Sequence, residues 1–81
     1  MDSRLAKWLA LESKFNQLLQ LDLSQNNIDV TGYIQLTSRQ AVYSHSLKKL
    51  TLEGNQIAGS FNQLVQKCQL PELEVLDLNL N

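Results

Sequence analysis

Leucine and asparagine recur along this chain in the pattern Leu-x-x-Leu-x-Leu-x-x-Asn, which occurs three times. The copies run from Leu18 to Asn26, from Leu47 to Asn55 and from Leu73 to Asn81. In each copy the last two leucines flank one polar residue, and this period of two predicts a strand with one buried face. The middle leucines are 29 and 26 residues apart, at Leu21, Leu50 and Leu76. Connections of this length predict that the three strands are parallel neighbours.

The residues before the first copy predict an amphipathic helix from Asp2 to about Lys14, which Asp2 or Ser3 can cap. Large apolar residues recur along one side of it at helical spacing, namely Leu5, Trp8, Leu11 and Phe15, with Leu9 at the border. Because its charges are of both signs, a helix lying on a membrane surface is disfavoured. We expect it to cover the open end of the stacked strands, since the end of such a stack needs a cap.

Helical spacing is also present between the copies. The first connection predicts a helix from Thr31 to about Tyr43, capped by Asp29 or Thr31, with apolar positions at Ile34, Leu36, Ala41 and Val42. The second predicts a helix from Ser60 to Cys68, with an apolar side at Phe61, Leu64, Val65 and Cys68. Pro71 stops any helix there, and we expect Gln69 and Leu70 to be non-helical.

The three copies and their connections resemble the leucine-rich repeat family over Leu18 to Asn81. The spacing is most similar to the ribonuclease-inhibitor-type subclass, in which a Gly and a Leu follow at set distances. Gly32 and Leu36 match after Asn26, whereas after Asn55 the match is shifted to Gly59 and Leu64. The resemblance implies a right-handed α/β solenoid in a single domain, residues 1–81. It would comprise a capping helix (1–16), repeats at 17–45 and 46–71, and a truncated third repeat (72–81).

The asparagines close each copy where the strand turns away, and we expect them to be structural. An amide at this bend can satisfy backbone groups that would otherwise lack partners. Replacing Asn55 with Leu should therefore cost about 1–3 kcal/mol of stability. The third copy stops at Asn81, so we expect no turn for this amide to serve, with Leu76, Leu78 and Leu80 near an uncapped edge. Two explanations stay open: a piece of a longer solenoid, or an edge covered by a second copy.

In a solenoid of this kind the exposed strand positions form one surface, which we call the strand face. Its residues are Gln20, Asp22, Ser24, Lys49, Thr51, Glu53, Val75, Asp77 and Asn79. The surface is polar and mildly acidic, Lys49 is its only cation, and it has no aromatic anchor. The resemblance implies a protein-interaction scaffold, and a basic peptide is the better electrostatic match. The alternatives are a solvated face without a partner, or a structural segment that caps a longer repeat protein or self-associates through the third strand.

Composition and charge limit the cellular locations and the classes of partner that we expect for this chain. The chain has 81 residues, a formal net charge of -1 and one cysteine. Its seven basic residues are scattered among eight acidic ones, which disfavours nucleic acid as a partner. No apolar run reaches membrane-spanning length. Because one cysteine allows no internal disulfide, and neither a signal peptide nor an Asn-x-Ser/Thr acceptor is present, we predict a cytoplasmic location.

Residues for catalysis are sparse, and we predict that the protein is not an enzyme and holds neither cofactor nor metal. His45 is the only histidine and lies between two serines, as in a loop. Cys68 falls on the apolar side of its helix, where a small buried hydrophobe is the simpler interpretation than a reactive thiol. One His and one Cys do not make a zinc site. No Gly-x-x-x-x-Gly-Lys-Ser/Thr phosphate loop occurs.

Overall fold

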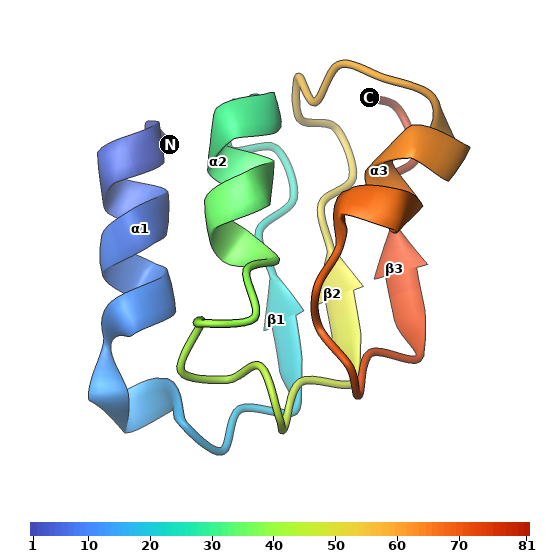
Figure 1. Ribbon diagram of the computed structural model, residues 1–81. Coiled ribbons are helices and arrows are strands. Elements are labelled where there is room, and N and C mark those ends of the chain that lie inside the picture. The colour runs from blue at the N-terminus through green and yellow to red at the C-terminus, as the bar shows by residue number, and fades with distance from the viewer.

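The computed structural model describes residues 1–81 as an α/β fold of three helices and a three-stranded parallel sheet (Figure 1). The elements in chain order are α1 (Ser3–Leu11), a 3-10 turn (Ser13–Phe15), β1 (Gln20–Asp22), α2 (Val30–Leu36), β2 (Lys49–Thr51), α3 (Phe61–Lys67) and β3 (Val75–Asp77). The helices form one layer and the strands another, in the order β1-β2-β3. The predicted α/β class and parallel sheet are confirmed.

The strands pair in the register that the leucine pattern predicts. Leu21 pairs with Leu50, and Leu50 with Leu76. Each strand has only three residues, but pairing continues beyond them: the Leu23 N–H donates to the Thr51 carbonyl at 2.9 Å. The Gly54 N–H likewise donates to the Asn79 carbonyl at 3.0 Å. The alternation of buried and exposed residues is clearest in the middle strand, where Leu50 is fully buried and Lys49 is exposed.

The first two helices begin at a predicted cap, and the third begins next to its predicted first residue, Ser60, because capping depends on local geometry. Asp2 accepts a hydrogen bond from the Leu5 N–H at 2.9 Å, and Asp29 accepts one from the Gly32 N–H at 2.9 Å. Ser60 and Gln63 form a reciprocal capping box at the start of α3. The helix runs from Phe61 to Lys67, with Ser60 and Cys68 as its caps, so the predicted second crossover helix is confirmed in place.

The other two helices are shorter than predicted. The first ends at Leu11, because Glu12 is extended, and the expected continuation to Lys14 is a 3-10 turn instead. The first crossover helix ends at Leu36, well before Tyr43. Tyr43 folds back so that its hydroxyl donates to the Leu36 carbonyl at 2.7 Å. A side chain thus takes up a carbonyl near the helix end, and the chain leaves the helix for a series of turns.

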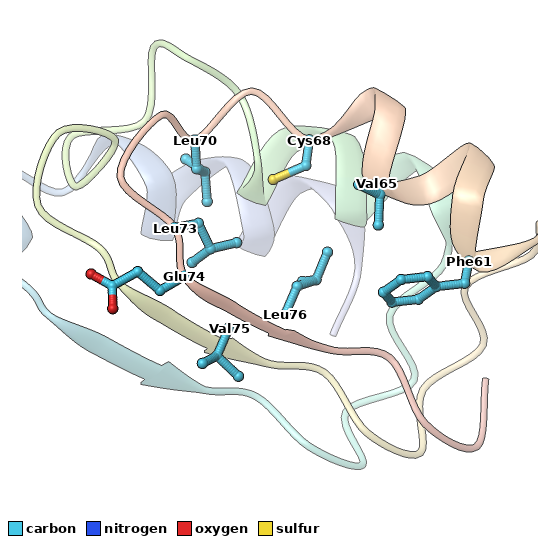
Figure 2. Close-up of a pocket in the computed structure, with 8 residues that line it drawn as sticks. All are labelled: Phe61, Val65, Cys68, Leu70, Leu73, Glu74, Val75 and Leu76. Carbon is cyan, nitrogen blue, oxygen red and sulfur yellow. The ribbon is translucent and has the colours of Figure 1, made fainter.

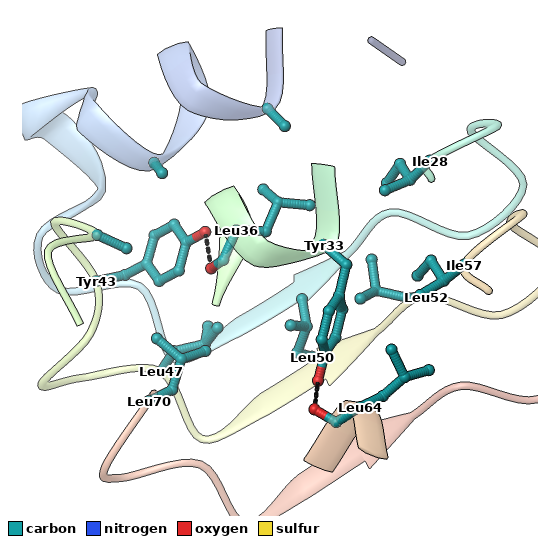
Figure 3. Close-up of a cluster of buried hydrophobic side chains, with 13 residues drawn as sticks. Ile28, Tyr33, Leu36, Tyr43, Leu47, Leu50, Leu52, Ile57, Leu64 and Leu70 are labelled. Atoms are coloured by element: carbon teal, nitrogen blue, oxygen red, sulfur yellow. Dashed lines mark hydrogen bonds between the residues drawn. The ribbon is translucent and has the colours of Figure 1, made fainter. Parts of the chain in front are cut away.

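The core combines the repeat leucines with two buried tyrosines (Figure 3). Tyr33 and Tyr43 are fully buried, and each hydroxyl donates to a backbone carbonyl, of Leu64 and of Leu36 respectively. These bonds satisfy the only polar atom of each ring, which allows an aromatic residue at the centre of a small core. Burial raises the pKa of both phenols well above the ordinary value.

The first helix buries a different face from the one predicted. Ala6 and Ala10 are its buried residues, whereas Leu5, Trp8 and Leu11 are 50%, 52% and 56% exposed. The reason is the close approach of α2. An added Cβ at Gly32 would lie 3.8 Å from the Ala6 Cβ, so only small side chains fit between the two helices. The helix therefore packs at the end of the helix layer beside α2, with its small residues inward and its large stripe outward.

Apolar positions on the other helices are also more exposed than predicted. Ile34 on α2 is 45% exposed, and Phe61 and Val65 on α3 are 57% and 43% exposed. Of the expected apolar side of α3, Leu64 is buried and Cys68 is half-buried. Helical spacing identified these residues as one side of a helix, but only part of that side has a neighbour to pack against.

Candidate functional site

The structure brings the predicted strand-face residues onto one side of the sheet. Gln20, Lys49 and Val75 are aligned across the three strands, and so are Asp22, Thr51 and Asp77. Ser24, Glu53 and Asn79 follow the strands in the turns. Between β1 and β2 the face has a shallow depression of about 100 Å³, lined by Gln20, Leu21, Asp22, Lys49 and Thr51.

Two of the acidic residues on this face also shape the turns that follow the strands. Asp22 Oδ1 accepts hydrogen bonds from the Ser24 N–H at 3.0 Å and the Ser24 hydroxyl at 2.6 Å. Asp77 Oδ1 accepts one from the Asn79 N–H at 3.0 Å. The Ser24 hydroxyl and N–H, followed by the charge of Lys49, hold the pKa of Asp22 below its ordinary value. Asp22 is thus an ionised and positioned acceptor, bonded through one oxygen to its own turn.

Asn55 has the structural role that the sequence predicts. Its Oδ1 accepts from the N–H groups of Asn26 and Ile28, both at 2.9 Å. Its Nδ2 donates to the carbonyls of Leu23 at 3.0 Å and Leu52 at 2.9 Å. Two of these four partners, Leu23 and Asn26, belong to the preceding copy of the pattern, and Ile28 lies just after it, so the amide joins one turn to the next. The side chain is buried, and a direct role in ligand binding is not available to it.

The expectation that Asn81 has no turn to serve is wrong. Its Oδ1 accepts from the Ile57 N–H at 3.0 Å, and its Nδ2 donates to the Leu52 carbonyl at 2.8 Å. The amide reaches back to the turn of the preceding copy, as that of Asn55 does. Asn26 has no preceding copy, and its side chain donates to the Ser24 carbonyl at 3.0 Å.

Each asparagine follows a residue in the left-handed region. The φ angles are +57° at Gln25, +71° at Gly54 and +60° at Leu80. Glycine adopts this conformation freely, whereas a residue with a Cβ is strained in it. Of these three residues, only Gly54 predicts a turn by its residue type. Gln25 and Leu80 occupy the same position as Gly54, because each directly precedes the asparagine that closes its copy of the pattern.

A second hollow was not anticipated from the sequence. It lies between α3 and β3 and has a volume of about 550 Å³ (Figure 2). We call it the terminal groove, and its lining is Phe61, Val65, Cys68, Leu70, Leu73, Glu74, Val75 and Leu76. Seven of these eight residues are apolar. The sequence did contain a relevant feature, because the predicted apolar side of α3 has several residues and only Leu64 among them is buried in the core.

The remaining candidate residues do not converge. His45 is exposed in a turn, as predicted, and Cys68 is half-buried on the wall of the terminal groove. Burial raises the pKa of the Cys68 thiol, which lowers the fraction present as reactive thiolate. No three His, Cys, Asp or Glu residues are grouped so that they could hold a metal ion. No helix is long and apolar enough to cross a bilayer; the longest has nine residues.

Comparison of the chain with protein-family models, with curated proteins and with solved structures finds no match. The leucine-rich repeat resemblance is therefore a prediction from the residues themselves, and the geometry described above is what bears on function.

Proposed function

We propose that this chain is a right-handed solenoid segment of the leucine-rich repeat kind and serves as a protein-interaction scaffold through its strand face. The observation that carries the proposal is the in-register pairing of three parallel strands. It aligns Asp22, Thr51 and Asp77, and beside them Gln20, Lys49 and Val75, on one accessible side. A side-by-side array of exposed side chains on a stiff backbone presents a partner with a preformed surface.

The turns support the solenoid part of the proposal. The same device follows each strand: a left-handed residue and then an asparagine whose amide binds the turn region. In the second and third copies the amide also binds the preceding copy. Structure that repeats with the sequence and contacts only its neighbour is the defining property of solenoids.

The charges of the strand face favour a basic partner. Asp22, Glu53 and Asp77 are opposed by Lys49 alone. Three strands spaced by about 4.8 Å span only about 10 Å, much less than a standard protein interface requires. We therefore expect a short basic segment to bind weakly, with an affinity that decreases as salt is added.

The test is the affinity for a lysine-rich model peptide, measured by fluorescence polarisation at low and at physiological salt. Replacing Asp22 and Asp77 together with Lys should abolish binding. The milder Asp22→Asn plus Asp77→Asn removes the charges and keeps an acceptor for the Ser24 and Asn79 N–H groups. The asparagine variant therefore distinguishes the effect of removing the charges from the effect of disrupting the turns. Circular dichroism checks that both variants fold.

A matched control places the same change in charge elsewhere. Glu72→Lys plus Glu74→Lys alters two exposed acids outside the strand face. If this control weakens peptide binding as much as the Asp22 and Asp77 variants do, the peptide responds to net charge, and the strand face is not the site. Unchanged affinity in the Asp22 and Asp77 variants refutes the proposal in the same way.

A structural function is the second candidate, and the terminal groove favours it. An end segment that caps a longer repeat protein, or assembles with itself, needs apolar surface at its end rather than on its strand face. The chain has such surface between α3 and β3.

A further inference from the structure

The outer side of α1 is an apolar stripe that nothing in the chain covers. Trp8, Leu5 and Leu11 are each at least half exposed. Ala6 and Ala10 face α2, and at 3.6 residues per turn Trp8 lies on the opposite side of the helix. The stripe therefore points away from α2. The helix that carries it lies at one end of the helix layer (Figure 1).

The opposite end of the layer carries the terminal groove. Phe61 and Val65 of α3 point toward Leu76 of β3, with Leu73 farther along the wall (Figure 2). The groove is open and lies beside α3, at the end of the row formed by α1, α2 and α3. One end of the molecule thus presents a convex apolar stripe, and the other presents a concave apolar hollow.

We propose that these two surfaces bind each other between copies of the chain. The α1 helix of one copy lies in the terminal groove of the next, with Trp8 as the central side chain. Within each chain α1 already packs beside α2, so a helix placed beside α3 would extend the same row. Val75 is the one strand-face residue that also lines the groove. The substitutions that test the contact leave the strand face unchanged, so they test it separately from the scaffold function proposed above.

Charge favours a second copy as the occupant. Residues 2–15, which contain α1, carry three basic and two acidic residues, whereas residues 61–81 carry one basic and three acidic residues. Arg4 and Lys7 accompany the stripe, and Glu74 lies on the wall of the groove. In the single chain Arg4 is 3.7 Å from Asp2 and Glu74 is 3.4 Å from Lys48, pairs that are exposed and easily exchanged.

The two surfaces differ, so the contact is heterologous and each copy keeps one free end. Association of this type continues from dimer to longer oligomers as concentration rises, unless a ring closes. Tryptophan in an apolar pocket is the side chain that most often dominates the binding energy of an interface. Truncation of Trp8 should therefore have a larger effect than any single charge change.

Sedimentation velocity and the fluorescence of Trp8, the only tryptophan, test the contact. From about 1 µM to about 1 mM, the range of weak contacts, the mean mass should rise. The Trp8 emission should shift to shorter wavelength over the same range as the ring leaves water. Trp8→Lys should raise the dissociation constant by about tenfold or more. A mass that stays at the monomer value throughout would overturn the proposal.

Mixing two variants gives the decisive result. Trp8→Lys damages only the stripe, and Val65→Lys, or Phe61→Lys as a second choice, damages only the groove. Each variant alone should stay monomeric at concentrations where wild type associates, because a copy needs both surfaces to associate with its own kind. An equal mixture should form a dimer and stop there, since one intact stripe meets one intact groove. If the mixture stays monomeric while wild type associates, the contact joins other surfaces and the proposal fails.

Ile34→Lys is the matched control. Ile34 is as exposed as Val65, is also apolar, and lies on α2 in the middle of the helix row. This variant should associate like wild type, and a loss equal to that of Val65→Lys would show that surface hydrophobicity alone drives association. Persistent association of Trp8→Lys would instead place the contact on a surface other than the α1 stripe, against the proposal.

Discussion

Asn55 offers the sharpest test of how the turns hold the fold together. Its side chain makes four hydrogen bonds of 3.0 Å or less, to the N–H groups of Asn26 and Ile28 and to the carbonyls of Leu23 and Leu52. Asn55→Ala removes all four and leaves these backbone groups without their partner. At about 1 kcal/mol per bond, moderated by water entering the partly open turn, we expect a loss of about 3 kcal/mol.

A loss of this size is a large part of the total free energy of unfolding. A chain of this length has an unfolding free energy of about 4–12 kcal/mol. In a domain of 60–100 residues each kcal/mol corresponds to about 4–8 °C in Tm, so the variant should melt about 12–24 °C lower. Urea unfolding followed by far-UV circular dichroism, at equal protein concentration, measures both the midpoint and the slope.

Asn26→Ala is the control, because it removes the same side chain from the equivalent position. The Asn26 side chain makes one hydrogen bond, to the Ser24 carbonyl. Its loss should cost less than about 1 kcal/mol. If the two variants lose equal stability, the amide of Asn55 does not act by joining one turn to the next, and the reasoning is refuted.

Three further results are expected. Leu80→Asn should raise the unfolding free energy by about 0.5–1 kcal/mol, since Leu80 has φ +60° and asparagine tolerates that region better; an unchanged urea midpoint would argue against strain there. The contribution of Tyr33 and Tyr43 to stability should be constant up to about pH 10, the unfolded-state pKa of tyrosine, and decrease above it. The folded state keeps Tyr33 and Tyr43 protonated by burial while the unfolded chain loses these protons, so urea midpoints at pH 9 and 11 should differ. Native Cys68 should react with a thiol reagent more slowly than free cysteine, because burial raises its pKa; equal rates at pH 8 would contradict this.

The strands and the helix starts could be predicted because both depend on short-range information. Leu50 and Leu76 lie at equivalent points of a repeated pattern, and a repeated pattern specifies register whatever the surrounding fold does. The caps Asp29 and Ser60 act on N–H groups three residues away. The strand-face positions follow from the same period of two, so their alignment was predictable, although their role in binding is still a prediction.

The terminal groove and the hydrogen bonds of Asn81 could not be predicted in this way. Asn81 bonds to Leu52 and Ile57, more than twenty residues earlier, and nothing in the local sequence indicates that contact. The groove exists because α3 has a wide apolar side and a neighbour on one flank only. Both features depend on which segments, distant in the sequence, lie side by side, and only the folded chain decides this.

The sequence by itself determined the α/β class, the parallel strands with their register, and the points where helices begin. Tertiary structure decided where the helices end and which side of each is buried. The Tyr43 hydroxyl donates to the carbonyl of the last residue of α2, and Ala6 packs against Gly32 of α2, which leaves Trp8 on the outer side of α1. Periodicity reports that a helix has an apolar side, whereas the size of the side chains across the contact selects the side that packs.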